Sequence, residues 1–162
     1  MQGMTWRFCF GIFLLSVLHS SYASRPPGIF QTDDLRQVAM IAQQAGRPIV
    51  LMISREHCPY CELLKREVLQ PRALHARYQN EIVLREVLID QGLMLTNFQG
   101  RRQDAAEFSQ AYGVRFTPTL LFLDPEGNEL SERIVGVNTL ELFNFYFESA
   151  IEEATNKILH RQ

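Results

Sequence analysis

Two cysteines, Cys58 and Cys61, stand two residues apart in the stretch REHCPYCELL. The chain has three cysteines, and the third, Cys9, lies in an apolar run near the amino terminus. A pair at this spacing suits three kinds of chemistry: thiol–disulfide exchange, half of a metal site, or a small structural disulfide.

Thiol–disulfide exchange needs a thiolate that attacks and a second thiol that displaces the product. An apolar run of strand length, residues 48–54, comes directly before the pair, and a helical pattern follows from Pro59 to Gln70. Cys58 is therefore expected at the start of a helix, where free N–H groups and the helix dipole stabilise an anion. Cys61 comes one turn later on the same face. Pro59 fits the first helical position, because its missing N–H has no helical partner there.

The metal and staple hypotheses fit the sequence less well. A structural zinc site uses four ligands, usually from two such pairs, and the chain has no second pair. Only His57 among the histidines after residue 23 lies near the cysteines. A disulfide that closes so small a ring removes little chain entropy, so it would be a poor staple. We therefore expect redox exchange, with no bound metal or cofactor.

Residues 1–23 have the order of a secretory signal peptide. An arginine precedes an apolar run over residues 8–18, and the small residues Ser21 and Ala23 follow it. An uncleaved membrane anchor is the alternative, but a span takes roughly 20 apolar residues. Cleavage after Ala23 would remove Cys9 and leave an exported chain in a compartment where disulfides persist, for which a bacterial periplasm is expected.

One domain is expected after the signal peptide. Residues 24–28 contain two consecutive prolines and suit a short linker, and residues 29–162 are long enough for a domain with a proper core. The hydrophobic fraction of 46% and the charged fraction of 21% are ordinary for a globular protein. A net charge of −2 gives no support to a nucleic-acid-binding surface.

Helical and strand patterns alternate along this domain. They predict a helix from Thr32 or Asp33 to Gly46, a strand over 48–54, and a helix over 59–70 that Pro71 interrupts or restarts. A strand over 81–90, an exposed loop over 91–103 and a helix over 104–113 follow. The last predicted elements are strands over 117–124 and 129–136 joined by a turn, and a closing helix with a capping box at Asn138 and Glu141. Helix–strand alternation implies parallel pairing, and the late hairpin implies an antiparallel edge. The prediction is an α/β fold with a mixed four- to five-stranded sheet and helices on both faces.

The helical spacing also predicts which side chains face the core. These are Leu35, Val38, Ile41, Ala42 and Ala45 in the first helix, and Leu142, Phe145, Phe147 and Ile151 in the last.

The chain resembles the thioredoxin superfamily, which includes thioredoxins, glutaredoxins and exported disulfide-exchange proteins. The resemblance rests on CPYC after a strand, on YGVRFTPTLLFLDPEGNEL and on IVGV before the last helix, and it covers nearly all of the chain after residue 23. The segment between Asp90 and Tyr112 resembles the exported SoxW-type subgroup. The resemblance implies a thioredoxin fold in which Cys58 attacks, Cys61 resolves, and the two form a disulfide.

The resemblance also implies a substrate groove. Pro118 would be cis and face the cysteines, and the backbone of Thr117 would pair with the extended chain of the substrate. Pro59 and Tyr60, between the cysteines, would line the groove as well, with a rim or packing role as the alternative for Tyr60.

Two departures from the family pattern concern the surroundings of the cysteines. The buried aspartate that thioredoxins carry six residues before the first cysteine is Met52 here, and their nearby lysine falls on Glu86. Glu86, and after it Glu56, are candidates for the proton acceptor of Cys61; the alternative is a solvated surface carboxylate. The usual tryptophan before the first cysteine is His57, which either holds charge near the thiolate or is an exposed residue on the rim.

The sequence thus predicts an exported thiol:disulfide oxidoreductase that acts on cysteines of other exported proteins. The threonine before Pro118 resembles reductases and isomerases and not the strong oxidant, so a reductase is expected, with an oxidase as the alternative direction. A reductase would need electrons from a membrane thiol transporter, because nothing in the chain indicates a nicotinamide or flavin site. A monomer is expected, since no separate dimerisation domain fits in this length. The alternatives are a non-catalytic thioredoxin-like module that holds a partner protein or a metal, and a peroxide- or glutathione-linked enzyme.

Overall fold

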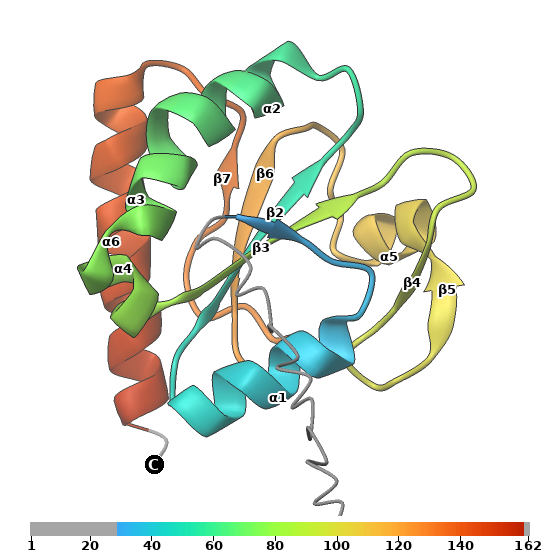
Figure 1. Ribbon diagram of the computed structural model, residues 1–162, viewed down its shortest axis with the longest axis horizontal. Helices are drawn as coiled ribbons and strands as arrows, with labels where there is room; N and C mark the ends of the chain where they lie inside the picture. Colours follow the sequence, from blue (N-terminus) through green and yellow to red (C-terminus); the bar gives the residue numbers. More distant parts are fainter. Residues whose placement is uncertain (1–28, 161–162) are drawn as a thin grey trace, which may run out of the picture.

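A mixed sheet of five strands runs through the centre of the protein (Figure 1). The computed structural model describes residues 29–160, so the predicted signal peptide and linker and the last two residues lie outside the described residues. The strands of the sheet, in spatial order, are β1 (Phe30–Gln31), β3 (Val83–Leu88), β2 (Ile49–Ser54), β6 (Thr119–Leu123) and β7 (Ile134–Val135). This confirms the predicted mixed α/β sheet.

The pairing within the sheet follows the predicted change of direction. β3 runs parallel to both β1 and β2, whereas β6 runs antiparallel to β2 and β7 antiparallel to β6. Every residue of β2 is buried, as expected for a central strand that is covered on both faces. The parallel pair β2–β3 needs a long crossover, and the helices that carry the cysteines supply it.

Helices cover both faces of the sheet (Figure 1). On one face lie α1 (Leu35–Ala45) and α5 (Ala105–Ala111), and on the other lie α2 (Pro59–Leu64), α3 (Gln70–Leu74), α4 (Ala76–Glu81) and α6 (Leu140–Leu159). The buried side chains accordingly form two clusters. One contains Met52, Cys61 and Phe147, and the other contains Leu51 and Phe108. Between residues 29 and 160, no helix combines the length and the apolar character that crossing a membrane requires.

The helix after the cysteines continues further than predicted. A π-helical segment, Lys65–Leu69, joins α2 to α3, and Pro71 stands in the first turn of α3, where the α-helix restarts. A proline cannot donate to the carbonyl four residues earlier, and the wider π turn accommodates that missing bond. The backbone N–H of Gln70 instead reaches the carbonyl of Lys65.

The predicted exposed loop over 91–103 was wrong. This segment forms a separate two-stranded hairpin, β4 (Met94–Thr96) and β5 (Arg102–Asp104). Leu95 is buried, and the side chain of Asn97 closes the turn by accepting the backbone N–H groups of Gln99 and Arg101 at 3.1 and 2.9 Å. Strands of three residues, one of them polar throughout, leave no alternating pattern to read.

The predicted strand over 129–136 pairs antiparallel with β6 as expected, but over a much shorter range. Only Ile134 and Val135 pair with β6, and Glu129 makes an isolated bridge to Leu123. Leu130 and Ser131 are adjacent and both buried, so the chain does not alternate between faces there. The hydroxyl of Ser131 donates instead to the carbonyl of Ala150 in α6 at 2.9 Å.

The caps of the two long helices lie one residue or more beyond the predicted positions. Asp34, not Thr32 or Asp33, caps α1 by accepting the backbone N–H of Gln37 at 3.0 Å. Thr139, not Asn138, caps α6 by accepting the N–H of Leu142 at 3.3 Å. Both are standard N-cap residue types. Gly46 ends α1 as predicted, with a left-handed backbone.

The inner face of α6 is rotated from the prediction. Phe147 and Ile151 are buried as expected, but Leu142 and Phe145 are exposed. The buried stripe consists of Phe143, Phe147, Ala150, Ile151, Ala154 and Ile158. Its two alanines are small enough to let the helix approach the sheet. The positions of the large residues alone therefore did not reveal which face of the helix is buried. In α1, Ile41 and Ala45 are likewise exposed.

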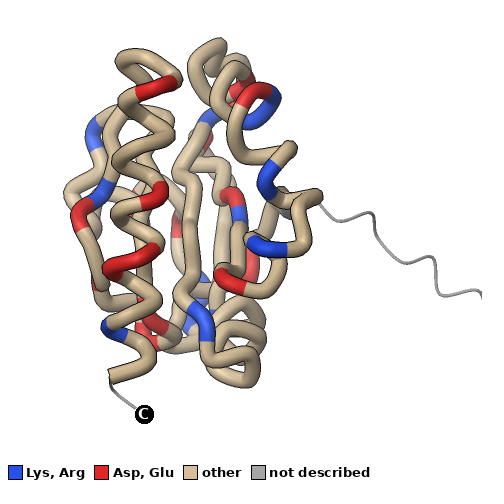
Figure 2. The backbone as a smooth tube through the Cα atoms, turned by 90° about the vertical axis from the view of Figure 1, so that its left-hand side faces the viewer, with Lys and Arg blue, Asp and Glu red and all other residues tan. Residues whose placement is uncertain are grey.

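Figure 2 shows the side of the molecule along α6, where acidic positions recur along the helix and a basic residue, Lys157, lies in its last turn. Glu152 and Glu153 are exposed, but Glu148 is used in packing. Its Oε1 accepts the hydroxyl of Tyr78 at 2.6 Å and the guanidinium of Arg72 at 3.3 Å. These contacts hold α6 against the helices that lead from the cysteines back to the sheet.

Candidate active site

Cys58 and Cys61 form a disulfide at the junction of β2 and α2, with their Cα atoms 5.2 Å apart. Cys58 is the N-cap of α2: its backbone is extended, and its Sγ accepts the backbone N–H of Cys61 at 3.2 Å. Pro59 occupies the first turn. The junction arises because the apolar strand ends at Ser54 and a proline fixes the helical backbone five residues later.

The two sulfurs differ in access. Cys61 is fully buried and packs in the core cluster beneath α2, whereas Cys58 is half-buried. An incoming reactant therefore meets Cys58. The N–H of Cys61 that points at Cys58 Sγ is a donor that an anionic sulfur accepts more strongly than a neutral one.

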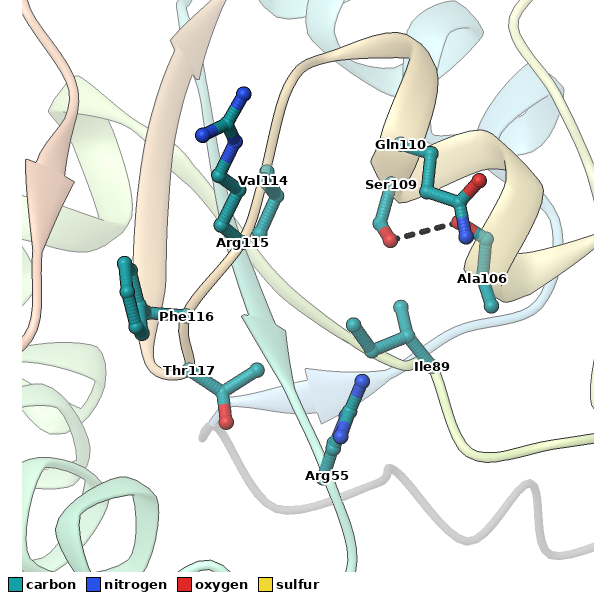
Figure 3. Close-up of a pocket in the computed structure, with 9 residues that line it drawn as sticks. All are labelled: Arg55, Ile89, Ala106, Ser109, Gln110, Val114, Arg115, Phe116 and Thr117. Carbon is teal, nitrogen blue, oxygen red and sulfur yellow. Dashed lines mark hydrogen bonds between the residues drawn. The ribbon is translucent and has the colours of Figure 1, made fainter.

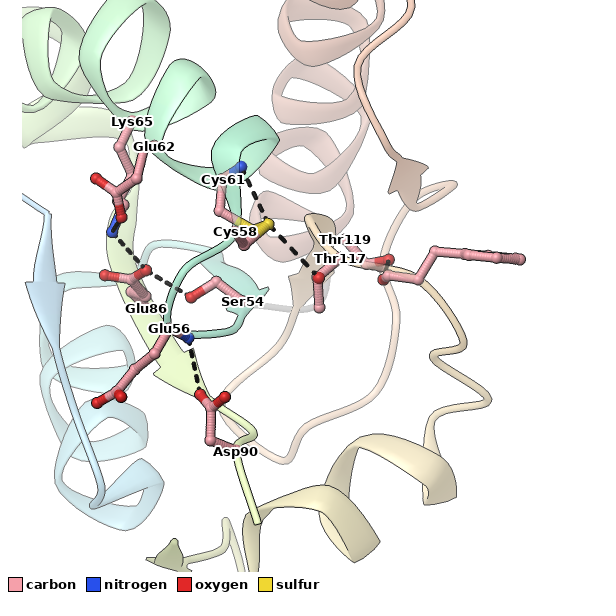
Figure 4. The surroundings of a disulfide bond; sticks show 11 residues. Ser54, Glu56, Cys58, Cys61, Glu62, Lys65, Glu86, Asp90, Thr117 and Thr119 are labelled. Carbon is pink, nitrogen blue, oxygen red and sulfur yellow. Dashed lines mark hydrogen bonds and ion pairs between the residues drawn. A yellow bond between two sulfur atoms is a disulfide. The ribbon is translucent and has the colours of Figure 1, made fainter.

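A loop before β6 faces the disulfide. The peptide bond between Thr117 and Pro118 is cis, and Thr117 Oγ1 lies 3.6 Å from Cys58 Sγ (Figure 4). The loop is fixed from within, since the hydroxyl of Thr119 donates to the carbonyl of Phe116 at 2.7 Å. It is also fixed to the neighbouring strand by the N–H of Gly136, which donates to the carbonyl of Pro118 at 2.8 Å.

The backbone of Thr117 is open to a partner. Within residues 29–160, neither its N–H nor its C=O takes part in a hydrogen bond, and the preceding Arg115 and Phe116 are exposed. Unpaired backbone groups beside an exposed side of a sheet are what an added strand needs. The loop can therefore accept an extended chain directly next to Cys58.

The other predicted groove residues lie at the rim. Tyr60 is 62% exposed, Pro59 is also exposed, and both flank the disulfide on the α2 side. His57 is exposed and has a φ of 55°, the only positive φ of a non-glycine residue between 29 and 160. That backbone conformation turns the chain from β2 into the helix and holds the imidazole away from the core.

Glu86 is not a solvated surface carboxylate. It is 6% exposed, and it lies in register with Met52 across the parallel pair β2–β3. Its Oε1 accepts the hydroxyl of Ser54 at 2.5 Å and pairs with the ammonium of Lys65 at 3.0 Å. The carboxylate thus sits beneath α2, on the sheet face against which Cys61 packs (Figure 4).

Glu56 does not share this arrangement. Its side chain is exposed, and its backbone N–H donates to Asp90 Oδ2 at 2.8 Å.

Lys65 connects the buried carboxylate to the surface. Its ammonium also lies 2.7 Å from Glu62 Oε1, on the exposed side of α2. Burial alone would lower the pKa of Lys65, but hydrogen bonds and charges from Glu62 and Glu86 outweigh it, so the pKa lies above the usual 10.5. Lys65 is therefore held as a cation beside Glu86.

Sequence reasoning missed the partners of Glu86. Lys65 stands four residues after Cys61, and residues at that spacing share a helix face. Ser54 stands two residues after Met52, and residues at that spacing share a strand face. Both spacings can be seen in the sequence. They point to Glu86 only once β2 is known to pair with β3. Arg55 and Arg115, which lie beside Thr117, were not singled out either.

The described residues contain no group of three or more His, Cys, Asp or Glu side chains arranged to hold a metal ion. The chemistry that the site supports is that of the sulfur pair.

Comparison with known proteins identifies the family. Residues 35–151 match the family model described as a thioredoxin-like domain. Thioredoxin f from spinach chloroplast is similar in structure, with a TM-score of 0.55 and 15% identity over 81% of this chain and 96% of that chain. A DsbH oxidoreductase has a TM-score of 0.56 and 22% identity, over 80% of this chain and 90% of that chain. A poplar thioredoxin h has a TM-score of 0.54 and 18% identity, over 75% of this chain and 95% of that chain. Among curated protein sequences, none matches this chain.

At these identities the structural likeness shows the fold, and the family model carries the assignment. The matched residues run from the start of α1 into α6 and include both cysteines and the Thr117–Pro118 loop. The chain belongs to the thioredoxin-like domain family.

Proposed function

We propose that this protein is a thiol:disulfide oxidoreductase that exchanges disulfides with cysteines of other proteins. One observation carries the proposal: an accessible sulfur, Cys58, lies 3.6 Å from the hydroxyl of Thr117 on an open loop, and its buried partner Cys61 lies directly behind it. Reduction of this disulfide would place an attacking thiolate, a resolving thiol and a site for an extended substrate chain next to one another.

The reaction in the reducing direction has two steps. The Cys58 thiolate attacks one sulfur of a substrate disulfide, which forms a mixed disulfide and releases the other substrate sulfur as a thiolate. Cys61 then loses its proton and attacks the sulfur of Cys58, which closes the Cys58–Cys61 bond and releases the second substrate thiolate. Two electrons pass from the protein to the substrate, and the described structure is the oxidised product.

Glu86 is the proposed acceptor of the Cys61 proton. It is a buried carboxylate on the sheet face where Cys61 packs, and Ser54 and Lys65 hold it in place. His57, at the rim next to Cys58, is proposed to add charge near the thiolate.

We further propose that the protein is exported to a periplasm, as a monomer of the SoxW-type subgroup, and works as a reductase there. The signal-like order of residues 1–23 supports export, and the threonine before Pro118 supports the reducing direction. A membrane thiol transporter would then re-reduce the disulfide, and exported proteins with cysteines would be the substrates.

Turnover tests the proposed exchange. The protein should reduce insulin with dithiothreitol as the electron source, and Cys58→Ser should abolish this activity. Cys61→Ser should accumulate mixed disulfides with its targets, because the resolving thiol is gone. A binding module would bind partners without turnover, and its binding would be insensitive to Cys58→Ser. Absence of both turnover and trapped partners would overturn the proposal.

Two measurements test the finer points. Expression of the full chain in a bacterial host, followed by the intact mass of the periplasmic product, tests export and cleavage after Ala23. The reduction potential tests direction: a value near that of thioredoxin, about −270 mV, supports a reductase, and a value near −120 mV, roughly that of a strong oxidant, contradicts it.

A further inference from the structure

A pocket opens on the side of the Thr117 loop that faces away from α2 (Figure 3). Its volume is about 340 Å³. Arg115 and Phe116 come from the loop on one side, Gln110 comes from α5 on the other, and Arg55 and Ile89 close the end near Thr117. The pocket is built from elements that the chain brings together only in the fold.

The pocket adjoins the exchange site through one shared residue. Thr117 lines it, and the hydroxyl of the same residue lies 3.6 Å from Cys58 Sγ. A substrate chain bonded to Cys58 and extended along Thr117 advances about 3.3 Å per residue. A side chain one or two residues from the substrate cysteine therefore arrives over this pocket.

The charge of the pocket is one-sided. None of the residues that line it is acidic, and the exposed Arg55 and Arg115 form no ion pair or hydrogen bond with another described residue. Two carboxylates, Asp90 and Asp104, lie beyond Arg55. Both are engaged with backbone N–H groups, Asp90 with that of Glu56 at 2.8 Å and Asp104 with those that begin α5.

The remaining lining favours a short polar side chain with an apolar stem. Ile89 and Ala106 supply apolar walls, the ring of Phe116 points away from the pocket (Figure 3), and the amide of Gln110 supplies a further donor. The hydroxyl of Ser109 is turned away to the carbonyl of Ala106 at 2.8 Å, so it does not offer a competing group. The two guanidinium groups lie at opposite ends of the pocket (Figure 3), so a glutamate or aspartate side chain that enters it can pair with either one while its stem contacts the apolar walls.

We propose that Arg55 and Arg115 select substrate proteins that carry an acidic residue within two positions of the cysteine they exchange. This inference rests on the proposed oxidoreductase function and names its substrate class. Electrostatic complementarity at a groove rim acts mainly on specificity and on the association rate, so the preference should weaken as salt screens it.

Three disulfide-containing peptides test the inference. They share one sequence, except that the residues next to the cysteine are glutamate, glutamine or lysine. At low ionic strength the full protein should reduce the glutamate peptide with a kcat/KM about tenfold above that of the glutamine peptide, and the lysine peptide should be the poorest. The ratio between the first two peptides is the readout.

Variants assign the preference to the pocket. Arg55→Gln and Arg115→Gln should each lower the ratio, and the double variant should bring it close to one. The double charge reversal, Arg55→Glu with Arg115→Glu, should make the lysine peptide the best substrate. Arg102→Gln is the matched control, because Arg102 is exposed on β5 and does not line the pocket.

The outcomes separate the inference from the proposed function. Failure to reduce any of the three peptides would count against the oxidoreductase. Equal reduction of the glutamate and glutamine peptides, or a preference that persists in the Arg55→Gln/Arg115→Gln protein, would overturn the inference alone. A preference that Arg102→Gln removes equally well would show general surface charge and would also overturn it.

Discussion

Lys65 stands one helical turn after Cys61, and its ammonium lies 3.0 Å from the carboxylate of Glu86. This ion pair joins α2 to β3 beneath the disulfide, and the Glu86 side chain is almost fully enclosed. A buried pair of this kind is expensive to break, because removal of one partner leaves the other charge uncompensated.

Lys65→Met should therefore destabilise the oxidised protein by about 2–4 kcal/mol. Replacement of both partners, Lys65→Met with Glu86→Met, should recover part of that loss, because no lone charge stays behind. Urea unfolding of the two variants and the parent, all with the disulfide intact, measures both quantities. A double variant that is no more stable than Lys65→Met would contradict the coupling.

The ion pair also gives a pH dependence. The pKa of Lys65 is raised in the folded protein, so its contribution to stability is complete below the unfolded value of 10.5 and is lost as the pH rises through the folded pKa. Urea unfolding at a series of pH values should show stability declining as the pH rises above 10.5 in the parent, and declining less in Lys65→Met.

Tyr112 should titrate late in the folded state. Burial raises its pKa to about 12, with further contributions from the charges of Glu129 and Asp124. The pKa of an unfolded tyrosine is about 10. The stabilising contribution of the neutral Tyr112 phenol is therefore present below pH 10 and is lost as the pH rises toward 12. Alkaline titration of tyrosinate absorbance in the parent and in Tyr112→Phe should isolate this group.

The Tyr112→Phe protein has a second expected property. The phenol donates to the carbonyl of Gly127 at 2.7 Å, and loss of that bond should cost about 1 kcal/mol at neutral pH. A difference titration that places Tyr112 near the ordinary value would contradict its burial against this turn.

Position 127 requires glycine for two reasons that can be tested separately. Its φ is 90°, and a Cβ there would lie 2.6 Å from Phe98 Cδ2 and 2.8 Å from the hydroxyl of Tyr112. Gly127→Ala should therefore destabilise the protein by about 2–4 kcal/mol, from backbone strain and from steric overlap. Gly92→Ala is the control, because Gly92 has a φ of 81° with nothing within 4 Å of the added carbon.

The control should lose only about 1 kcal/mol, which is the backbone part. Urea midpoints of the two alanine variants give the difference directly. Equal losses would mean that Phe98 and Tyr112 move aside without cost.

The fold was predictable where one pattern dominates a segment. The five consecutive apolar residues of β2, 49–53, and the periodicity of α1 lead directly to the observed elements. The hairpin β4–β5 was not predictable, because Leu95 is its only fully buried apolar side chain and the strands are held by backbone pairing that leaves no trace in composition. In α6, exposed Phe145 misled the assignment of the inner face, since an aromatic residue is not obliged to be buried.

The sequence predicts the position of the two cysteines but not the contacts that they make with distant segments. The spacing of Cys58 and Cys61 and the strand before them suffice to place the sulfurs at a helix start. Their contact with Thr117 spans 59 residues of sequence and entered through a family resemblance, not through local pattern. The enclosure of Glu86 depends on the register of β2 with β3, which no single segment encodes.

Glu86→Gln tests the proposed proton acceptor. Glutamine keeps the size of the side chain and can still accept the hydroxyl of Ser54, but it cannot take a proton. Attack by Cys58 should proceed at an unchanged rate, whereas resolution by Cys61 should slow by about 10²-fold. Rapid-mixing experiments with the reduced protein and a peptide disulfide, quenched in acid, should show the mixed disulfide accumulating.

Glu62→Gln is the matched control for this step. Glu62 pairs with the same ammonium as Glu86, 2.7 Å from Lys65 Nζ, but its side chain is 62% exposed and lies on the outer side of α2. If Glu86 acts only by fixing Lys65, both variants should slow resolution alike; if it accepts the proton, only Glu86→Gln should accumulate the mixed disulfide. Each substitution removes one negative charge that pairs with Lys65. The comparison therefore separates the loss of a proton acceptor from a change in the charge around Lys65. Equal accumulation in both variants, or none in either, would rule out Glu86 as the acceptor.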